Sequence, residues 1–152
     1  MSIRNALIVL VFVSVVPVGC ESTAQPEYED ISGIFTGPVS GSGSGYSIQG
    51  SFSLSISQSE GSLSGTYSTS VTVQTPAGSV PFAGSGTISG VIEAGADPKV
   101  EVVVQDVCNA ELPYIGAFNS ASRTLSASGP FPLYDGCNPV ATLTLTITLS
   151  KT

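Results

Sequence analysis

Apolar and polar residues alternate along most of the chain beyond residue 30. The clearest run lies near the C-terminal end, where Leu143, Leu145, Ile147 and Leu149 alternate with threonines. Strict alternation over this length indicates a β-strand that buries one face, and no stretch after residue 30 has the 3.6-residue spacing of an amphipathic helix. The pattern therefore predicts an all-β domain with no substantial helix.

Seven further runs precede this one: 31–37, four runs between 48 and 104, then 113–119 and 123–129. Turn residues at 59–62, 94–98 and 119–122 separate several of them. Eight consecutive strands with short connections predict an antiparallel up-and-down β-barrel, because closure at this number removes free sheet edges. The side chains expected to face one side of the sheet in the four central runs are Ile48, Phe52, Leu54, Ile56, Leu63, Tyr67, Val71, Val73, Val80, Phe82, Ile88, Ile92, Val100, Val102 and Val104.

Alternation alone does not say which face of a barrel points outward. An alternative therefore has the apolar face toward lipid and the Ser/Thr face lining a pore. The absence of aromatic girdles at both strand ends argues against this alternative.

The first twenty residues have the organisation of an export signal. A single Arg4 precedes a largely apolar run over 6–18, which is too short to be an ordinary membrane-spanning helix. The run ends in Val18, Gly19 and Cys20, and this ending resembles the lipobox of bacterial lipoproteins. The resemblance implies cleavage after residue 19, lipidation of Cys20, and attachment to the cell envelope, at the outer membrane if the organism has one.

Three cysteines in an exported protein leave an odd thiol unless one of them is consumed by other chemistry. Lipidation of Cys20 would leave Cys108 and Cys137, which can form a disulfide in an oxidising compartment. Two free buried thiols are the alternative.

The order of the strands gives the domain an orientation. In an up-and-down barrel, connections 1–2, 3–4, 5–6 and 7–8 share one end, and the proposed disulfide joins two of these. Residues 38–45 and 130–139 are expected to be long loops at that end, which we call the mouth. The N-terminus enters at the opposite end, which we call the base. Segment 20–30 is polar and acidic, with a Pro and no apolar periodicity, and is therefore interpreted as a tether, with 31–152 as the barrel domain.

Composition limits the possible chemistry. Of the 152 residues 41% are hydrophobic and only 10% are charged, and the chain contains neither His nor Trp. Imidazole catalysis and His-based nucleophile arrangements are therefore excluded. Without Arg4 the chain has 11 acidic and 3 basic side chains, a balance of −8, which disfavours binding to nucleic acid. Because no motif for catalysis or for a cofactor is present, a non-enzymatic protein is expected.

The segment Gly33-Ile34-Phe35 opens the first predicted strand. Its position is similar to that of the Gly-x-Trp motif in the small meander barrels of the lipocalin and avidin superfamilies, with Phe in place of Trp. The resemblance implies an eight-stranded barrel with an open mouth, and a late basic residue, Lys151, packed on the ring of Phe35. Without Trp walls, it does not imply biotin binding.

The mouth is the best candidate for a site. It is expected to gather Tyr46, Phe131, Leu133 and Tyr134, with the carboxylates of Asp106, Glu111 and Asp135. This set suggests binding of a small apolar ligand. Calcium held by the three carboxylates is disfavoured, because no contiguous Asp-x-Asp spacing occurs. The sequence thus predicts a monomeric, lipid-anchored protein that binds an apolar ligand, or alternatively a structural or protein-interaction lipoprotein with a filled barrel.

Overall fold

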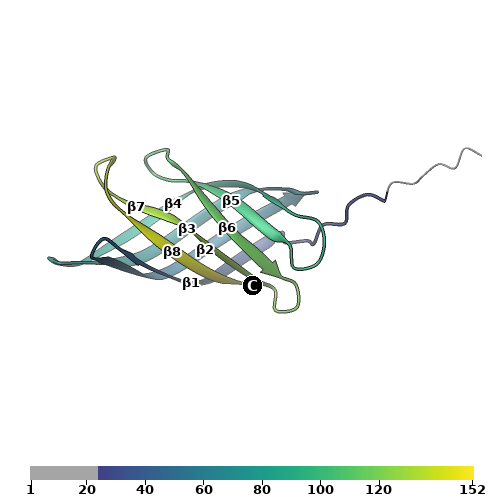
Figure 1. Ribbon diagram of the computed structural model, residues 1–152, viewed down its shortest axis with the longest axis horizontal. Coiled ribbons are helices and arrows are strands. Elements are labelled where there is room, and N and C mark those ends of the chain that lie inside the picture. The colour runs from purple at the N-terminus through teal and green to yellow at the C-terminus, as the bar shows by residue number, and fades with distance from the viewer. Residues whose placement is uncertain (1–23) are drawn as a thin grey trace, which may run out of the picture.

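The computed structural model describes residues 24–152, which form a closed barrel of eight antiparallel strands in sequential order (Figure 1). Each strand pairs with its neighbours in the chain, and the first pairs with the last. This confirms the predicted fold class. The strands are β1 (Gly33–Gly43), β2 (Tyr46–Ser59), β3 (Ser62–Thr75), β4 (Gly78–Ile92), β5 (Lys99–Gln105), β6 (Glu111–Asn119), β7 (Thr124–Asp135) and β8 (Asn138–Lys151).

The predicted signal peptide and Cys20 lie outside the described residues. Within residues 24–152 no helix is long and apolar enough to cross a membrane.

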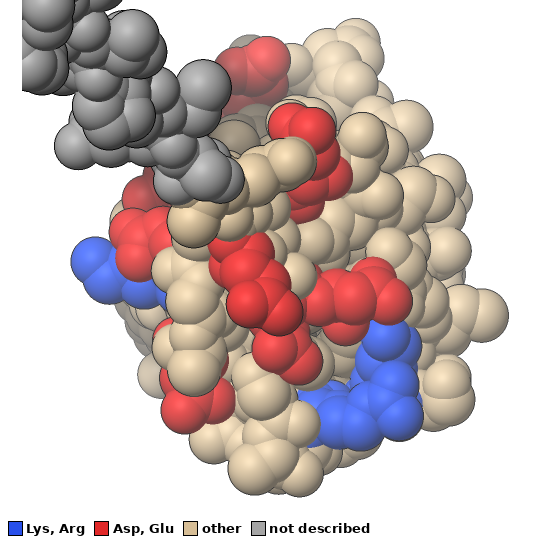
Figure 2. Space-filling model, turned by 90° about the vertical axis from the view of Figure 1, so that its right-hand side faces the viewer, with Lys and Arg blue, Asp and Glu red and all other residues tan. Residues whose placement is uncertain are grey.

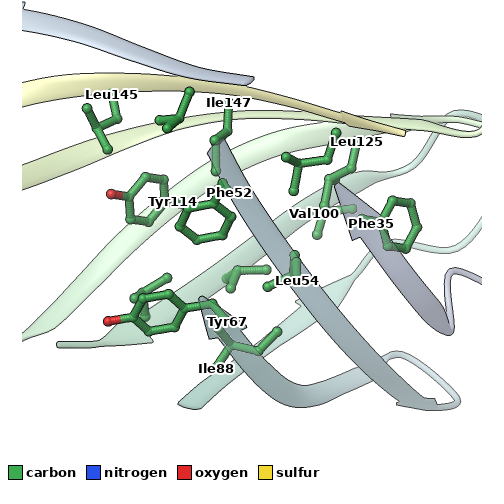
Figure 3. Packing of buried hydrophobic residues seen from close by; sticks show 14 of the residues in the cluster. Phe35, Phe52, Leu54, Tyr67, Ile88, Val100, Tyr114, Leu125, Leu145 and Ile147 are labelled. Atoms are coloured by element: carbon green, nitrogen blue, oxygen red, sulfur yellow. The ribbon is translucent and has the colours of Figure 1, made fainter. Parts of the chain in front are cut away.

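The apolar side of every strand faces the barrel interior. Seventeen of the nineteen apolar side chains predicted on strands two to five and eight are buried, and Figure 3 shows how rings and aliphatic groups from different strands interdigitate. The outward positions of β8 are threonines. This orientation contradicts the alternative in which the Ser/Thr face lines a pore.

Val80 and Phe82 of β4 are the two exceptions to the predicted core, with 53% and 37% of their surface exposed. The reason lies in the register. β4 pairs with β5 only through 88–92, because β5 is a short strand of seven residues. Residues 78–87 of β4 therefore extend beyond the wall that would cover them.

The connections at the mouth are shorter than predicted. Residues 38–43 and 130–135 belong to β1 and β7, and only Ser44-Gly45 and Gly136-Cys137 form the turns. The prediction of long loops there was wrong, because these Gly-, Ser- and Pro-rich segments find ladder partners along β2 and β8. Connection 5–6 (106–110) is the longest at this end.

The described part of the acidic segment 20–30 contacts the barrel, so the segment is not a free spacer along its whole length. The carbonyl of Glu27 accepts a hydrogen bond from the amide of Gly95 at 3.1 Å. The side chain of Gln58 accepts from the amide of Ile31 at 2.9 Å and donates to the carbonyl of Glu29 at 3.0 Å. Ile31 itself is fully buried. The chain thus docks on the base before β1 begins.

The basic side chains of the described residues gather at the base, together with many of the acidic ones. Lys99, Arg123 and Lys151, the basic residues of the described part, all lie at this end. Figure 2 looks onto the base and shows basic groups beside clustered acidic ones. A hydrogen bond from the backbone of Ser32 to the carboxylate of Asp30 lowers the pKa of Asp30. The mouth, in contrast, has no Lys or Arg among residues 24–152.

Candidate functional site at the barrel mouth

The barrel wall is interrupted on one side of the mouth. β6 pairs with β7 only through 115–119, and β4 pairs with β5 only through 88–92. Gly86 and Gly129 still lie against Gln105 of β5 and Pro113 of β6, but the mouth-side ends of β4 (78–85) and β7 (130–135) have no strand paired between them in the described structure. The ring of Phe82 crosses this gap and meets the ring of Phe131 edge-on, with centroids 6.0 Å apart.

A cavity of about 190 Å³ lies beneath this gap. Its walls come from β2, β3, β4, β6, β7 and β8 and from the end of β5 with connection 5–6. Most of the lining is apolar, and six side chains are aromatic. The lining residues are Phe52, Tyr67, Thr69, Phe82, Val104, Asp106, Val107, Leu112, Tyr114, Phe131, Pro132, Leu133, Tyr134, Gly136 and Leu145.

The floor of the cavity is made by aromatic rings. Phe52 and Tyr67 stack nearly parallel, with centroids 5.5 Å apart and an interplanar angle of 3°. Figure 3 shows the hydroxyl groups of Tyr67 and Tyr114 pointing away from Phe35, which lies near the base. Below this floor lies a second, much smaller void of about 20 Å³. The interior is therefore filled in its lower half and hollow near the mouth.

Asp106 organises connection 5–6. One carboxylate oxygen, Oδ1, accepts hydrogen bonds from the amides of Cys108 and Ala110 at 2.9 and 2.8 Å. The other, Oδ2, accepts from the hydroxyl of Tyr134 at 2.6 Å. The bond to the carboxylate raises the pKa of Tyr134 to about 12, because the phenol must stay protonated to donate it.

The predicted disulfide is present. Cys108 of connection 5–6 and Cys137 of the β7–β8 turn are bonded, with their Cα atoms 5.5 Å apart. The cross-link and the Tyr134–Asp106 hydrogen bond hold the same loop against β7. Both therefore fix the rim of the cavity.

The remaining hydroxyl groups of the lining are used within the protein. Tyr114 donates to the carbonyl of Pro130 at 3.0 Å, and Tyr67 donates to the carbonyl of Gln105 at 3.4 Å. Thr69 donates to the carbonyl of Ser51 at 3.1 Å. Burial raises the pKa of Tyr114 and of Tyr67, because the low-dielectric surroundings disfavour the phenolate form.

Four of the residues predicted for the mouth line this cavity: Phe131, Leu133, Tyr134 and Asp106. Tyr46, at the start of β2, packs against the core but is not part of the lining.

The structure does not assemble a metal site from the three predicted carboxylates. Glu111 begins β6 and Asp135 ends β7, and both are exposed. No group of three or more His, Cys, Asp or Glu side chains within residues 24–152 is placed to hold a metal ion. Asp106 instead accepts hydrogen bonds from the amides and the phenol described above.

Sequence reasoning missed four aromatic residues of the lining: Phe52, Tyr67, Phe82 and Tyr114. The alternating pattern predicted that Phe52, Tyr67 and Phe82 are buried core residues, but it did not place them in a ligand site, and it did not identify Tyr114. The alternating pattern indicates that such rings are buried, but the level of the barrel that each one reaches depends on the stagger between strands, so the sequence offers no signal that places them at the mouth.

Comparisons with protein-family models, with curated proteins and with solved structures give no significant match. The function must therefore be inferred from the cavity itself.

Proposed function

We propose that this protein is a lipid-anchored, non-enzymatic binding protein of the cell envelope, whose barrel takes a small apolar ligand at the mouth. The observation that carries the proposal is the cavity of about 190 Å³, lined mainly by apolar and aromatic side chains. Sites for small molecules are typically concave and apolar, with a few placed polar groups. Asp106 and the tyrosine hydroxyls supply those polar groups here.

The size of the cavity limits the ligand. An apolar protein cavity of about 150 Å³ stays dry and can bind benzene. The cavity in this barrel therefore fits a molecule with one ring and a small substituent. A long acyl chain has no room, because Phe52, Val104 and Tyr114 separate the cavity from the small void below.

The position of the cavity agrees with attachment through Cys20. The chain contacts the base at Glu27, whereas the cavity opens at the other end. Seven residues span at most about 25 Å, so a lipid on Cys20 would keep the base near the membrane and the mouth turned away from it.

The competing function is that of a structural or protein-interaction lipoprotein. The packed lower half of the barrel favours it, since a void of about 20 Å³ leaves no continuous interior channel below the aromatic floor. In that case the cavity would only reflect imperfect packing near an interrupted wall.

Ligand binding separates the two functions. Residues 24–152 contain all eight strands, the core and the disulfide, so this segment can be produced alone by export to an oxidising compartment. We expect an NMR titration to show that tert-butylbenzene binds it, with shifts at Tyr114 and Phe131, and that palmitate does not enter the cavity. Absence of any shift with small apolar molecules would favour the structural alternative.

A matched pair of variants locates the binding. Leu133→Trp adds bulk to the cavity wall and should weaken binding of tert-butylbenzene at least about tenfold, because small apolar sites depend on unfilled volume. Val140→Trp introduces the same indole ring at a side chain that is 61% exposed and should leave the affinity unchanged. Equal effects of the two substitutions would contradict binding in the cavity.

Anchoring has its own test. In a bacterial host, radiolabelled palmitate should be incorporated into the full chain and not into the Cys20→Ala variant. Equal labelling of the two proteins would refute lipidation at Cys20.

A further inference from the structure

We propose that the ligand of the mouth cavity is a small organic cation, a protonated amine or quaternary ammonium on an apolar body. This inference rests on the proposed binding function and specifies its ligand. It is carried by three independent features of the cavity: its aromatic walls, its single carboxylate, and the direction of its hydrogen bonds.

The first feature is the aromatic lining. Phe52, Tyr67, Phe82, Tyr114, Phe131 and Tyr134 surround one space. The face of an aromatic ring carries partial negative charge and attracts a cation within about 6 Å of the centroid. Rings that come from five different strands and enclose a cavity resemble, in their chemistry, a cage for an ammonium group.

The second feature is charge. Asp106 is the one charged residue in the lining. Its oxygens accept three hydrogen bonds, from two amides and one phenol, and a carboxylate has room for about four. One acceptor position is left for a ligand. No Lys or Arg of residues 24–152 lies at the mouth to compete for it, whereas Glu111 and Asp135 lie nearby at the same end.

The third feature is that the side-chain hydroxyls of the lining already donate their protons. Tyr67, Tyr114 and Thr69 donate to backbone carbonyls, and Tyr134 donates to Asp106. Their oxygen lone pairs remain as acceptors. A ligand that fits these side chains must therefore supply donors or positive charge, and an anion would meet no complementary side chain.

Three molecules of matched shape and size test the inference: phenyltrimethylammonium, tert-butylbenzene and benzenesulfonate, which differ in charge. In NMR titrations of residues 24–152 at low ionic strength, we expect the cation to bind about tenfold more tightly than the neutral molecule. The anion should bind most weakly. If the neutral molecule binds as tightly as the cation or more tightly, the inference fails and the proposed function stands. If none of the three binds, both fail.

Variants of two carboxylates identify the group that produces the preference for the cation. Asp106→Asn keeps an oxygen for the amides of Cys108 and Ala110 but removes the charge. It should lower the preference for the cation over tert-butylbenzene about fivefold. Glu111→Gln makes the same change in net charge at the same end, outside the lining, and should preserve the preference. An equal loss in both variants would overturn a role for the cavity carboxylate. If Asp106→Asn does not fold, the order of the three ligands on the unmodified protein decides.

Discussion

Replacing Phe35 by alanine should lower the free energy of unfolding by about 3–5 kcal/mol. Phe35 is fully buried near the base, and its ring meets Phe118 edge-on with centroids 6.0 Å apart. It pairs across the β1–β8 ladder with Lys151, where the barrel closes. Removal of the ring would leave a cavity at the joint between the first and last strands. Urea unfolding of residues 24–152, followed by tyrosine fluorescence, measures the loss.

Phe82→Ala provides the matched control for this prediction. Phe82 is 37% exposed and lies at the mouth, so its removal should cost less than about 1.5 kcal/mol of unfolding free energy. It should instead weaken ligand binding, since the ring lines the cavity and contacts Phe131. Equal stability losses in the two variants would contradict the division of the barrel into a packed base and a hollow mouth.

Removing the disulfide should cost about 3–4 kcal/mol of unfolding free energy, as expected from the chain-entropy model for a loop of this length. The double variant Cys108→Ser/Cys137→Ser breaks a link between residues 29 positions apart. Because the link fastens connection 5–6 to the β7–β8 turn, amide hydrogens of 106–111 should also exchange faster. Denaturant unfolding and hydrogen exchange measure the two effects.

Chemical reduction of the unmodified protein is the control for the disulfide. It should reproduce both the stability and the exchange of the double variant. Unchanged exchange at the mouth after reduction would mean that the Tyr134–Asp106 hydrogen bond holds the loop without the cross-link.

Much of the fold could be predicted because alternation reports directly on burial. The leucines and isoleucine of β8 are buried, and the intervening threonines are exposed, as the pattern predicts. Strand parity also brought Cys108 and Cys137 to the same end. The prediction of buried residues failed where burial depends on the length of the neighbouring strand. Val80 has the correct parity for the interior, but β5 ends too early to cover it.

The candidate site was only partly predictable for the same reason. Phe131, Leu133 and Tyr134 could be placed at the mouth because they lie next to a connection. Tyr67 and Tyr114 lie within strands, and which level of the barrel they reach depends on the stagger between strands, which the sequence does not reveal. The docking of 29–31 against Gln58 was missed because a single glutamine side chain makes the key hydrogen bonds.

The most direct test of ligand binding at the mouth is the location of a bound molecule. Intermolecular nuclear Overhauser effects should connect the methyl protons of tert-butylbenzene with ring protons of Tyr67, Tyr114 and Phe131 in residues 24–152, since these rings enclose the cavity. Contacts confined to the outer face of the barrel, or no contacts at a saturating concentration, would contradict a ligand site inside the mouth.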